Sequence, residues 1–117
     1  MTKLKLVLFA LMSLFLANNS YAAFLANQSA TEIYGSDDIL FGFSSTPSDL
    51  CKYYNRQLKF DATTEKGKNI LSILLAAKMS GKRIDVWYTP STTPGTTEAN
   101  GCTRTTMGIL TQIGIRD

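Results

Sequence analysis

Trp87 is the residue of this chain best suited to bind a ligand. It lies in the stretch 83–89, where side chains alternate as in a strand and Ile84, Val86 and Tyr88 share one face. Trp87 therefore falls on the face opposite this apolar set. An outward-facing tryptophan offers a flat apolar surface and one hydrogen-bond donor, which suits a sugar ring or a contact between subunits. The alternative is that the helix or the next loop covers it as part of the core.

The segment that follows this strand supplies hydroxyl groups. Residues 89–103 are rich in Ser, Thr, Pro, Gly and Asn, a composition typical of a loop. Hydroxyls near its start could bind a polar ligand beside Trp87, although a solvated surface loop is the other interpretation. The predicted ligand-binding residues are Trp87, Thr89 and Ser91.

Cys51 and Cys102 are the two cysteines of the chain. In an exported protein two cysteines are expected to form a disulfide, because export removes them from the reducing cytosol. The bridge would close a loop of 51 residue steps (102 − 51). The chain-entropy model values such a loop at roughly 4 kcal/mol. Two free thiols are the alternative, and the absence of a CxxC motif argues against a redox role.

Catalytic chemistry finds no support in the sequence. The chain contains no histidine, which excludes Ser-His and Cys-His nucleophilic pairs and the usual zinc sites. It also lacks a phosphate-binding loop, a nucleophile elbow and a dinucleotide fingerprint. The adjacent Asp37 and Asp38 fit a tight turn better than a pair of catalytic carboxylates. We predict no catalytic residue, no metal site, no cofactor and no enzymatic activity.

The first residues have the pattern of a secretory signal peptide. Basic residues precede an apolar run over 6–17, and the tripeptide SYA (20–22) places small residues where signal peptidase cleaves. The apolar run is too short for a stable membrane span, and no later stretch is long or apolar enough. The prediction is a cleaved signal peptide at 1–22 and one domain at 23–117, in the periplasm or outside the cell.

Net charge gives no reason to expect an anionic partner. Twelve basic and nine acidic residues give the whole chain +3, but loss of Lys3 and Lys5 leaves ten and nine, a net of +1 (10 − 9). A balanced surface of this kind predicts neither nucleic-acid binding nor attraction to an anionic membrane.

A helix over about 64–80 is the strongest local pattern. Apolar residues recur at helical spacing, and Ser80-Gly81 can end the helix because glycine adopts the left-handed conformation easily. The apolar surface extends around most of the helix, which is typical of burial on more than one side. A plain core helix is one interpretation, and contact with a second subunit is the other. The interface candidates are Ile73, Ala76 and Ala77.

Short alternating segments on both sides of this helix predict strands. They lie at 31–34, 39–44 and 56–61 before the helix, and at 83–89 and 105–115 after it. Residues 23–30 read as a lead-in. In the last strand, one face is expected to carry Met107, Ile109, Ile113 and Ile115. The order β-β-β-α-β-β predicts an α+β, mainly β domain, a small barrel of the oligonucleotide/oligosaccharide-binding (OB) type.

With these residues identified, the chain resembles the binding subunits of pentameric bacterial toxins, closest to subtilase cytotoxin B and the type II heat-labile enterotoxin B subunits. The resemblance rests on the helix ILSILLAAKMSGK running into the strand RIDVWY, and on the strand MGILTQIGI. The segment TPSDLCKYYNRQL is similar to the cysteine-bearing start of cholera toxin B. The resemblance covers roughly 49–115. Trp87 matches a Val-Trp pair that follows the helix in the cholera-type chain.

The resemblance implies a non-catalytic binding module that recognises host glycans. It further implies a homo-oligomeric, pentamer-like ring and an exported catalytic A subunit as partner. The main alternative is a small periplasmic or secreted structural or protein-interaction domain with no glycan binding. An enzyme inhibitor or immunity protein, which would form a tight one-to-one complex, is a third hypothesis.

Overall fold

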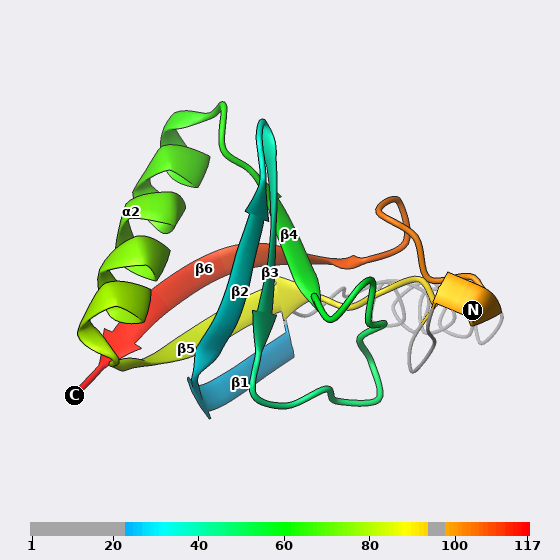
Figure 1. Ribbon diagram of the computed structural model, residues 1–117, viewed down its shortest axis with the longest axis horizontal. Helices are drawn as coiled ribbons and strands as arrows, with labels where there is room; N and C mark the ends of the chain where they lie inside the picture. The colour runs from blue at the N-terminus through cyan, green and yellow to red at the C-terminus, as the bar shows by residue number, and fades with distance from the viewer. Residues whose placement is uncertain (1–22, 94–97) are drawn as a thin grey trace, which may run out of the picture.

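Six strands of the chain form one mixed sheet with an α-helix packed against it (Figure 1). The computed structural model describes residues 23–93 and 98–117, so the predicted signal peptide at 1–22 lies outside the described residues. The elements are β1 (Ala23–Gln28), β2 (Ala30–Gly35), β3 (Asp38–Phe43), β4 (Leu58–Asp61), α2 (Glu65–Ser80), β5 (Arg83–Thr89), the 3-10 helix η1 (Glu98–Asn100) and β6 (Gly108–Arg116). The expected α+β, mainly β class is confirmed.

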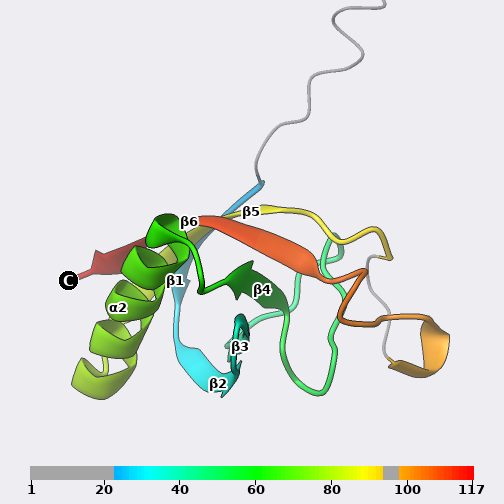
Figure 2. The same ribbon diagram turned by 90° about the horizontal axis from the view of Figure 1, so that it is seen from above.

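The sheet has the strand order β1-β5-β6-β4-β3-β2. Strands β4 and β6 run parallel, and every other neighbouring pair is antiparallel. In Figure 2 the sheet is bent, with β5 and β6 on one side and β2 and β3 on the other. Strands β1 and β2 are its two edges, although Ser29 alone separates them in the chain. The six strands thus form an open sheet in the described residues, whereas the sequence led us to expect a barrel.

Strand β1 is the element that the sequence did not predict. Residues 23–30 were expected to be a lead-in, yet β1 pairs antiparallel with β5 and brings Phe24 opposite Trp87. Four strands therefore precede the helix, and the predicted order β-β-β-α-β-β is short by one strand. The alternation of apolar and polar side chains is weak in this segment, because its alanines are small enough to lie either in the core or at the surface. Its strand conformation depends on pairing with β5 rather than on its own residues.

Helix α2 begins and ends where the sequence predicted. The Thr64 hydroxyl accepts a hydrogen bond from the Gly67 amide at 2.9 Å and caps the first turn. Gly81 ends the helix with a left-handed φ of 71°. A Cβ at Gly67 would lie 1.7 Å from the Asp61 carbonyl oxygen, so the helix can approach β4 this closely only with glycine there.

The predicted face of the last strand is wrong in part. Met107 and Ile113 are buried, but Ile109 and Ile115 are exposed, and Leu110 is buried instead. The cause is a register shift in the β5–β6 pair, where Trp87 faces Gln112 and the next residue faces Leu110. This extra residue in β6 reverses which side chains point inward from there on.

The core is divided between the two faces of the sheet. The larger cluster lies between the sheet and α2, and it includes Phe41, Leu74 and Ile84. Because side chains alternate along β3, Leu40 points to the other face. There it joins a smaller cluster with Cys51, Cys102 and Met107, against which Tyr53 packs. This second cluster supports the loops that border the site described next.

Among the residues that the structure describes, no helix combines the length and the apolar character needed to cross a membrane.

Candidate functional site

A groove of about 1020 Å³ lies beside strands β2 and β3, on the side of the smaller cluster. Two loops border it: residues 44–57, between β3 and β4, and the β5–β6 loop, of which 90–93 and 98–107 are described and which contributes Arg104. Its lining combines aromatic, basic, acidic and amide side chains. The residues are Glu32, Ile33, Tyr34, Gly35, Ser36, Leu40, Tyr53, Tyr54, Asn55, Arg56 and Arg104.

Tyr54 stands at the tip of a tight hairpin within the first loop. The backbones of Tyr53 and Arg56 bond each other in both directions, at 2.9 and 3.0 Å. Between them, Tyr54 and Asn55 have φ values of 46° and 66°. Two central residues with positive φ are typical of a type I′ turn. Asparagine adopts this conformation easily, but for tyrosine it is uncommon and costs roughly 1–2 kcal/mol.

A cation–aromatic arrangement forms the adjoining wall of the groove. The Arg56 guanidinium carbon lies 4.3 Å from the centre of the Tyr34 ring, and its terminal nitrogen lies 3.2 Å from a Glu32 carboxylate oxygen. The rings of Tyr53 and Tyr54 meet edge to face at 4.6 Å. Despite these contacts, Tyr34 is 64 % exposed and Tyr54 is 59 % exposed. The groove therefore presents two aromatic side chains held in place and open to solvent.

One polar atom in this wall has no partner. Arg56 Nε is buried and makes no hydrogen bond to any residue that the structure describes. Most buried polar atoms are hydrogen-bonded, so this unpaired N–H is an exception, and it lies in a side chain that lines the groove.

Gln57 fixes the base of the first loop. Its side chain is buried, and its amide nitrogen donates to the Phe43 and Ser45 carbonyl oxygens, both at 3.1 Å. The same nitrogen donates to the Thr46 hydroxyl at 2.9 Å, while its amide oxygen accepts from the Phe43 amide at 3.1 Å. The Gln57 amide thus bonds both backbone groups of Phe43, as a residue of a neighbouring strand would. These bonds fix the direction in which the loop leaves the sheet.

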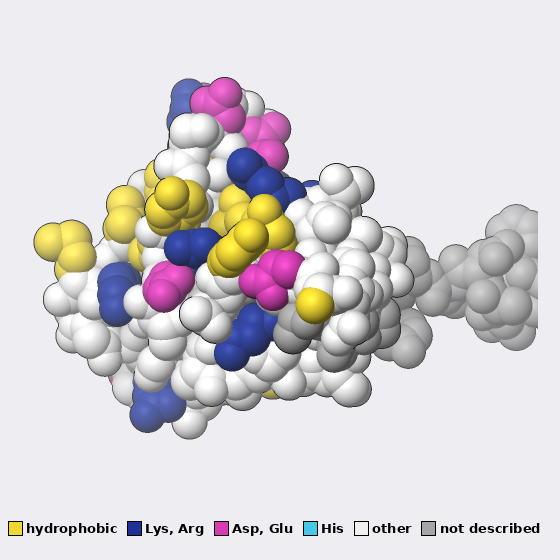
Figure 3. All heavy atoms as spheres, turned by 45° about the vertical axis from the view of Figure 1, so that its right-hand side comes forward, with side chains coloured by type: hydrophobic (Ala, Val, Ile, Leu, Met, Phe, Trp, Pro, Cys, Tyr) yellow, Lys and Arg dark blue, Asp and Glu magenta, His cyan; other side chains and the backbone are white. Residues whose placement is uncertain are grey.

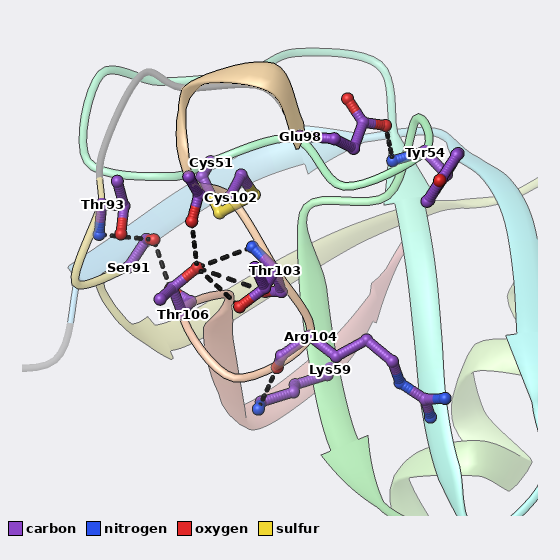
Figure 4. Close-up of a disulfide and its surroundings, with 11 residues drawn as sticks. Cys51, Tyr54, Lys59, Ser91, Thr93, Glu98, Cys102, Thr103, Arg104 and Thr106 are labelled. Atoms are coloured by element: carbon purple, nitrogen blue, oxygen red, sulfur yellow. Dashed lines mark hydrogen bonds between the residues drawn. A yellow bond between two sulfur atoms is a disulfide. The ribbon is translucent and has the colours of Figure 1, made fainter.

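The predicted disulfide is confirmed and joins the two loops that border the groove. Cys51 and Cys102 have an S–S distance of 2.10 Å and a Cα–Cα distance of 5.7 Å, and both are buried. Glu98 adds a second link by accepting a hydrogen bond from the Tyr54 amide at 2.6 Å. Lys59 on β4 donates to the Arg104 carbonyl oxygen. Figure 4 shows the Arg104 side chain extending away from the disulfide.

The predicted ligand-binding residues lie elsewhere, and none of them lines the groove. Trp87 is half-buried on β5 and stacks against Phe24, with ring centres 4.7 Å apart. Thr89 is exposed at the end of β5. Ser91 is buried, and its hydroxyl donates to the Thr106 carbonyl oxygen and accepts from the Thr93 amide, so both bonds are internal to its loop.

The interface candidates on α2 occupy three different environments. Ala77 is fully buried in the core of this chain, Ile73 is half-buried and Ala76 is exposed. The outer face of the helix also carries Leu75, 41 % exposed, and Met79, 87 % exposed. On the face shown in Figure 3, apolar side chains lie in separate groups with charged side chains between them.

Two of the titratable groups with shifted pKa values, Tyr88 and Asp85, lie on β5. Burial, and then the hydrogen bond that Tyr88 donates to Asp49 at 2.9 Å, raise the pKa of Tyr88 well above its ordinary value. The Arg116 guanidinium first, and then the Asn27 amide, hold the pKa of Asp85 below its ordinary value. Neither group lines the groove. Within 23–93 and 98–117, no cluster of three or more potential metal ligands occurs.

The sequence does contain one local signal for the groove, which the prediction centred on Trp87 left aside. The run Tyr53-Tyr54-Asn55-Arg56 follows Cys51 closely and places asparagine where a type I′ turn favours it. Two tyrosines beside such a turn cannot share one strand face, so at least one of them had to point away from the core.

Comparison with protein-family models, with curated proteins and with solved structures gave no match for this chain.

Proposed function

We propose that this protein is an exported, non-catalytic module that binds glycans in the groove beside β2 and β3. The observation that carries the proposal is the pair Tyr34 and Tyr54, both more than half exposed within a lining that also contains arginine, glutamate and asparagine. A sugar ring has an apolar C–H face that packs on an aromatic ring, and hydroxyls around its rim. Planar side chains such as those of Arg56 and Asn55 can bond these hydroxyls.

The topology supports an OB-type interpretation of the fold. Strands β1 and β2, interrupted at Ser29, act together as one strand that pairs with β5 at its start and with β3 at its end. Counted in this way, the described residues form five strands, the third and fifth run parallel, and the helix lies between the third and fourth. An OB fold is a partly open five-stranded barrel.

The position of the groove fits the same interpretation in part, because its strand residues come from β2 and β3, the first and second strands in this count, and none comes from β4, the third. OB folds bind oligosaccharides and oligonucleotides over their second and third strands and the loops between strands one and two and strands four and five. Here those loops are the β2–β3 turn and the β5–β6 loop, which contribute Ser36 and Arg104 to the groove. The small net charge favours a sugar over a nucleic acid.

The resemblance to toxin binding subunits extends the proposal. In that setting the protein would be secreted or periplasmic, would assemble into a pentamer-like ring and would carry an exported catalytic subunit. The glycan-binding proposal does not depend on the ring or on the catalytic subunit, because the groove is formed within one chain.

The test is retention of the oxidised chain, starting at Ala23, on a printed array of mammalian oligosaccharides. Tyr34→Ala and Tyr54→Ala should each lose most of the retention, because a sugar face packs on an aromatic ring much as a base does, and base stacking is worth about 1–3 kcal/mol. Met79→Ala is the matched control, because this exposed side chain lies on α2, outside the groove. Absence of retention for the unmodified chain would refute the proposal. Equal retention by all variants would show that the glycan binds outside this groove, and Trp87→Ala would then be the next variant to test.

A protein-interaction domain without glycan binding is the second candidate, and the exposed apolar pair Leu75 and Met79 favours it. It predicts no retention on the array. It also predicts that the immobilised protein recovers one defined partner, and that Met79→Glu abolishes this recovery.

A further inference from the structure

We propose that Arg104 contacts the bound glycan directly and that the Cys51–Cys102 bridge is the positioning device that holds Arg104 opposite the tyrosines. This inference rests on the proposed function, because it assigns roles within the same groove. It adds a contact residue from the β5–β6 loop and gives the disulfide a task beyond stability.

Arg104 differs from Arg56 in having no partner for its charged group. Arg56 pairs with Glu32 through a terminal nitrogen and lies over the Tyr34 ring, so one edge and one face of its guanidinium are already used. The Arg104 guanidinium is exposed and, within the part of the chain that the structure describes, makes no hydrogen bond or ion pair. A free guanidinium offers five N–H donors in one plane, a geometry that matches two adjacent oxygen atoms on a ligand.

The disulfide lies next to the groove on both loops. Tyr53 follows Cys51 by two residues, and Arg104 follows Cys102 by two residues. The bridge holds the two Cα atoms 5.7 Å apart. Because Tyr53 and Arg104 each lie only two residues from a bridged cysteine, this distance sets the separation of the two groove walls. The bridge itself is buried against Leu40 in the smaller cluster, so its own position is fixed by packing.

Three other contacts help to hold the two loops. The Ser91 amide donates to the Asp49 carbonyl oxygen at 2.9 Å, near the start of the second loop. Glu98 accepts from the Tyr54 amide, and Lys59 on β4 donates to the Arg104 carbonyl oxygen, both in exposed settings. Exposed hydrogen bonds and charged contacts of this kind contribute little and exchange readily with water. Without the bridge, the position of Arg104 relative to Tyr53 would depend on these two exposed contacts, on the Ser91–Asp49 hydrogen bond thirteen residues before Arg104 (104 − 91), and on the backbone of its own loop.

A double-mutant cycle on the printed array of mammalian oligosaccharides tests the inference. Arg104→Ala should weaken retention about tenfold, which is the loss expected for one charged hydrogen-bonding group. The pair Cys51→Ser and Cys102→Ser should weaken it by a similar factor. When the serine pair is combined with Arg104→Ala, retention should fall little further, because the bridge acts through Arg104.

Each outcome of the cycle decides one question. If the unmodified chain is retained and Arg104→Ala is retained equally, the inference is overturned and the proposed function stands. If the effects of Arg104→Ala and of the serine pair multiply, the bridge does not act through Arg104 and the positioning role is overturned. If the unmodified chain is not retained, the proposed function fails and the inference fails with it.

Hydrogen exchange separates local loosening from loss of the fold in the serine pair. Removal of the bridge should speed exchange at the Tyr54 amide while the β5–β6 amides stay protected. Unchanged protection at Tyr54 would contradict the positioning role. Arg104→Ala leaves the bridge intact, so its effect on retention decides the contact role even if the serine pair does not fold.

Discussion

Tyr54 combines backbone strain with an exposed aromatic ring, which is a combination that favours binding over stability. Its φ of 46° suits asparagine far better than tyrosine. Strain of this kind persists where the surrounding structure holds it, and it is common at binding sites.

We predict that Tyr54→Asn stabilises the protein while weakening glycan retention. Relief of the left-handed strain should raise the free energy of unfolding by about 0.5–1 kcal/mol, measured by urea denaturation. Loss of the ring should reduce retention on the array. Tyr34→Ala serves as the comparison, because Tyr34 lies on regular strand β2 and its removal should weaken retention without any gain in stability. A Tyr54→Asn variant that is less stable than the parent would contradict the strain argument.

Gln57 is expected to be one of the most sensitive polar positions in the chain. Its buried amide makes four hydrogen bonds, which Gln57→Ala would remove together. The Phe43 amide and carbonyl would be left without this partner, so the free energy of unfolding should fall by about 2–3 kcal/mol. Urea denaturation measures the loss. Gln28→Ala is the control: Gln28 is also buried, but only its oxygen bonds across to another loop, so its loss should be smaller.

At the level of elements, α2 was predicted correctly because its signals are local. Helical spacing of apolar residues, the Thr64 cap and the Gly81 stop all lie within the helix or beside it. The two strands of the β2–β3 hairpin and the turn at Asp37 and Asp38 were predicted for the same reason, since the turn residues lie between the two strands. The disulfide needed only the count of cysteines and the expectation of export.

The elements that sequence reasoning missed depend on partners distant in the chain. Strand β1 forms by pairing with β5, far along the chain, and its own alternation is weak. The register shift near Thr111 arises from the β5–β6 pairing and reverses the faces of β6. The groove is likewise assembled from β2, β3, the 44–57 loop and Arg104, so the run 53–56 indicates only one of its walls. The predicted residues Trp87, Thr89 and Ser91 all came from one short stretch, 87–91, and the structure shows Ser91 buried.

Gly67 sets the distance between α2 and β4, and we predict that Gly67→Ala destabilises the protein. Helix propensity alone would favour alanine by about 1 kcal/mol. The added Cβ would, however, lie 1.7 Å from the Asp61 carbonyl oxygen, so the helix would have to move away from the strand. The net loss should exceed the roughly 1 kcal/mol expected for Gly81→Ala, where the cost is only the left-handed φ and the space is open. Thermal unfolding of both variants checks the order.

For the whole molecule, the free energy of unfolding plotted against pH should form a plateau, with a fall at acid pH (the acid limb) and a fall at alkaline pH (the alkaline limb). Asp61, Asp85 and Asp117 have lowered pKa values, due mainly to hydrogen bonds from Thr63, Arg116 and Lys82 respectively. A lowered pKa adds stability above the unfolded-state value of about 3.9, and this stability is lost as pH falls through the folded-state value. Tyr88 acts in the opposite sense. Its raised pKa adds stability below about pH 10 that is lost as the pH rises further.

Two variants separate these limbs. Tyr88→Phe should flatten the alkaline limb while leaving the acid limb unchanged, and Asp85→Asn should make the acid limb shallower without abolishing it, because Asp61 and Asp117 remain. The measurement is the urea midpoint of unfolding, followed from about pH 2 to about pH 11 so that both limbs are covered. An alkaline limb of equal slope in Tyr88→Phe would assign it to other groups.

The outer face of α2 decides between a ring and a single chain. Leu75 and Met79 are four residues apart, so they share one helix face, and both remain exposed in the isolated chain. If this face meets a second subunit, size-exclusion chromatography with light scattering should give an oligomer for the oxidised chain, and Met79→Glu should convert it to the monomer, because an unpaired charge in such a contact is costly. Ile109→Glu is the matched control, since it places the same charge at an exposed apolar position on β6. A monomer without any substitution would remove the ring from the proposal. It would leave the groove intact, because every residue that lines the groove comes from one chain.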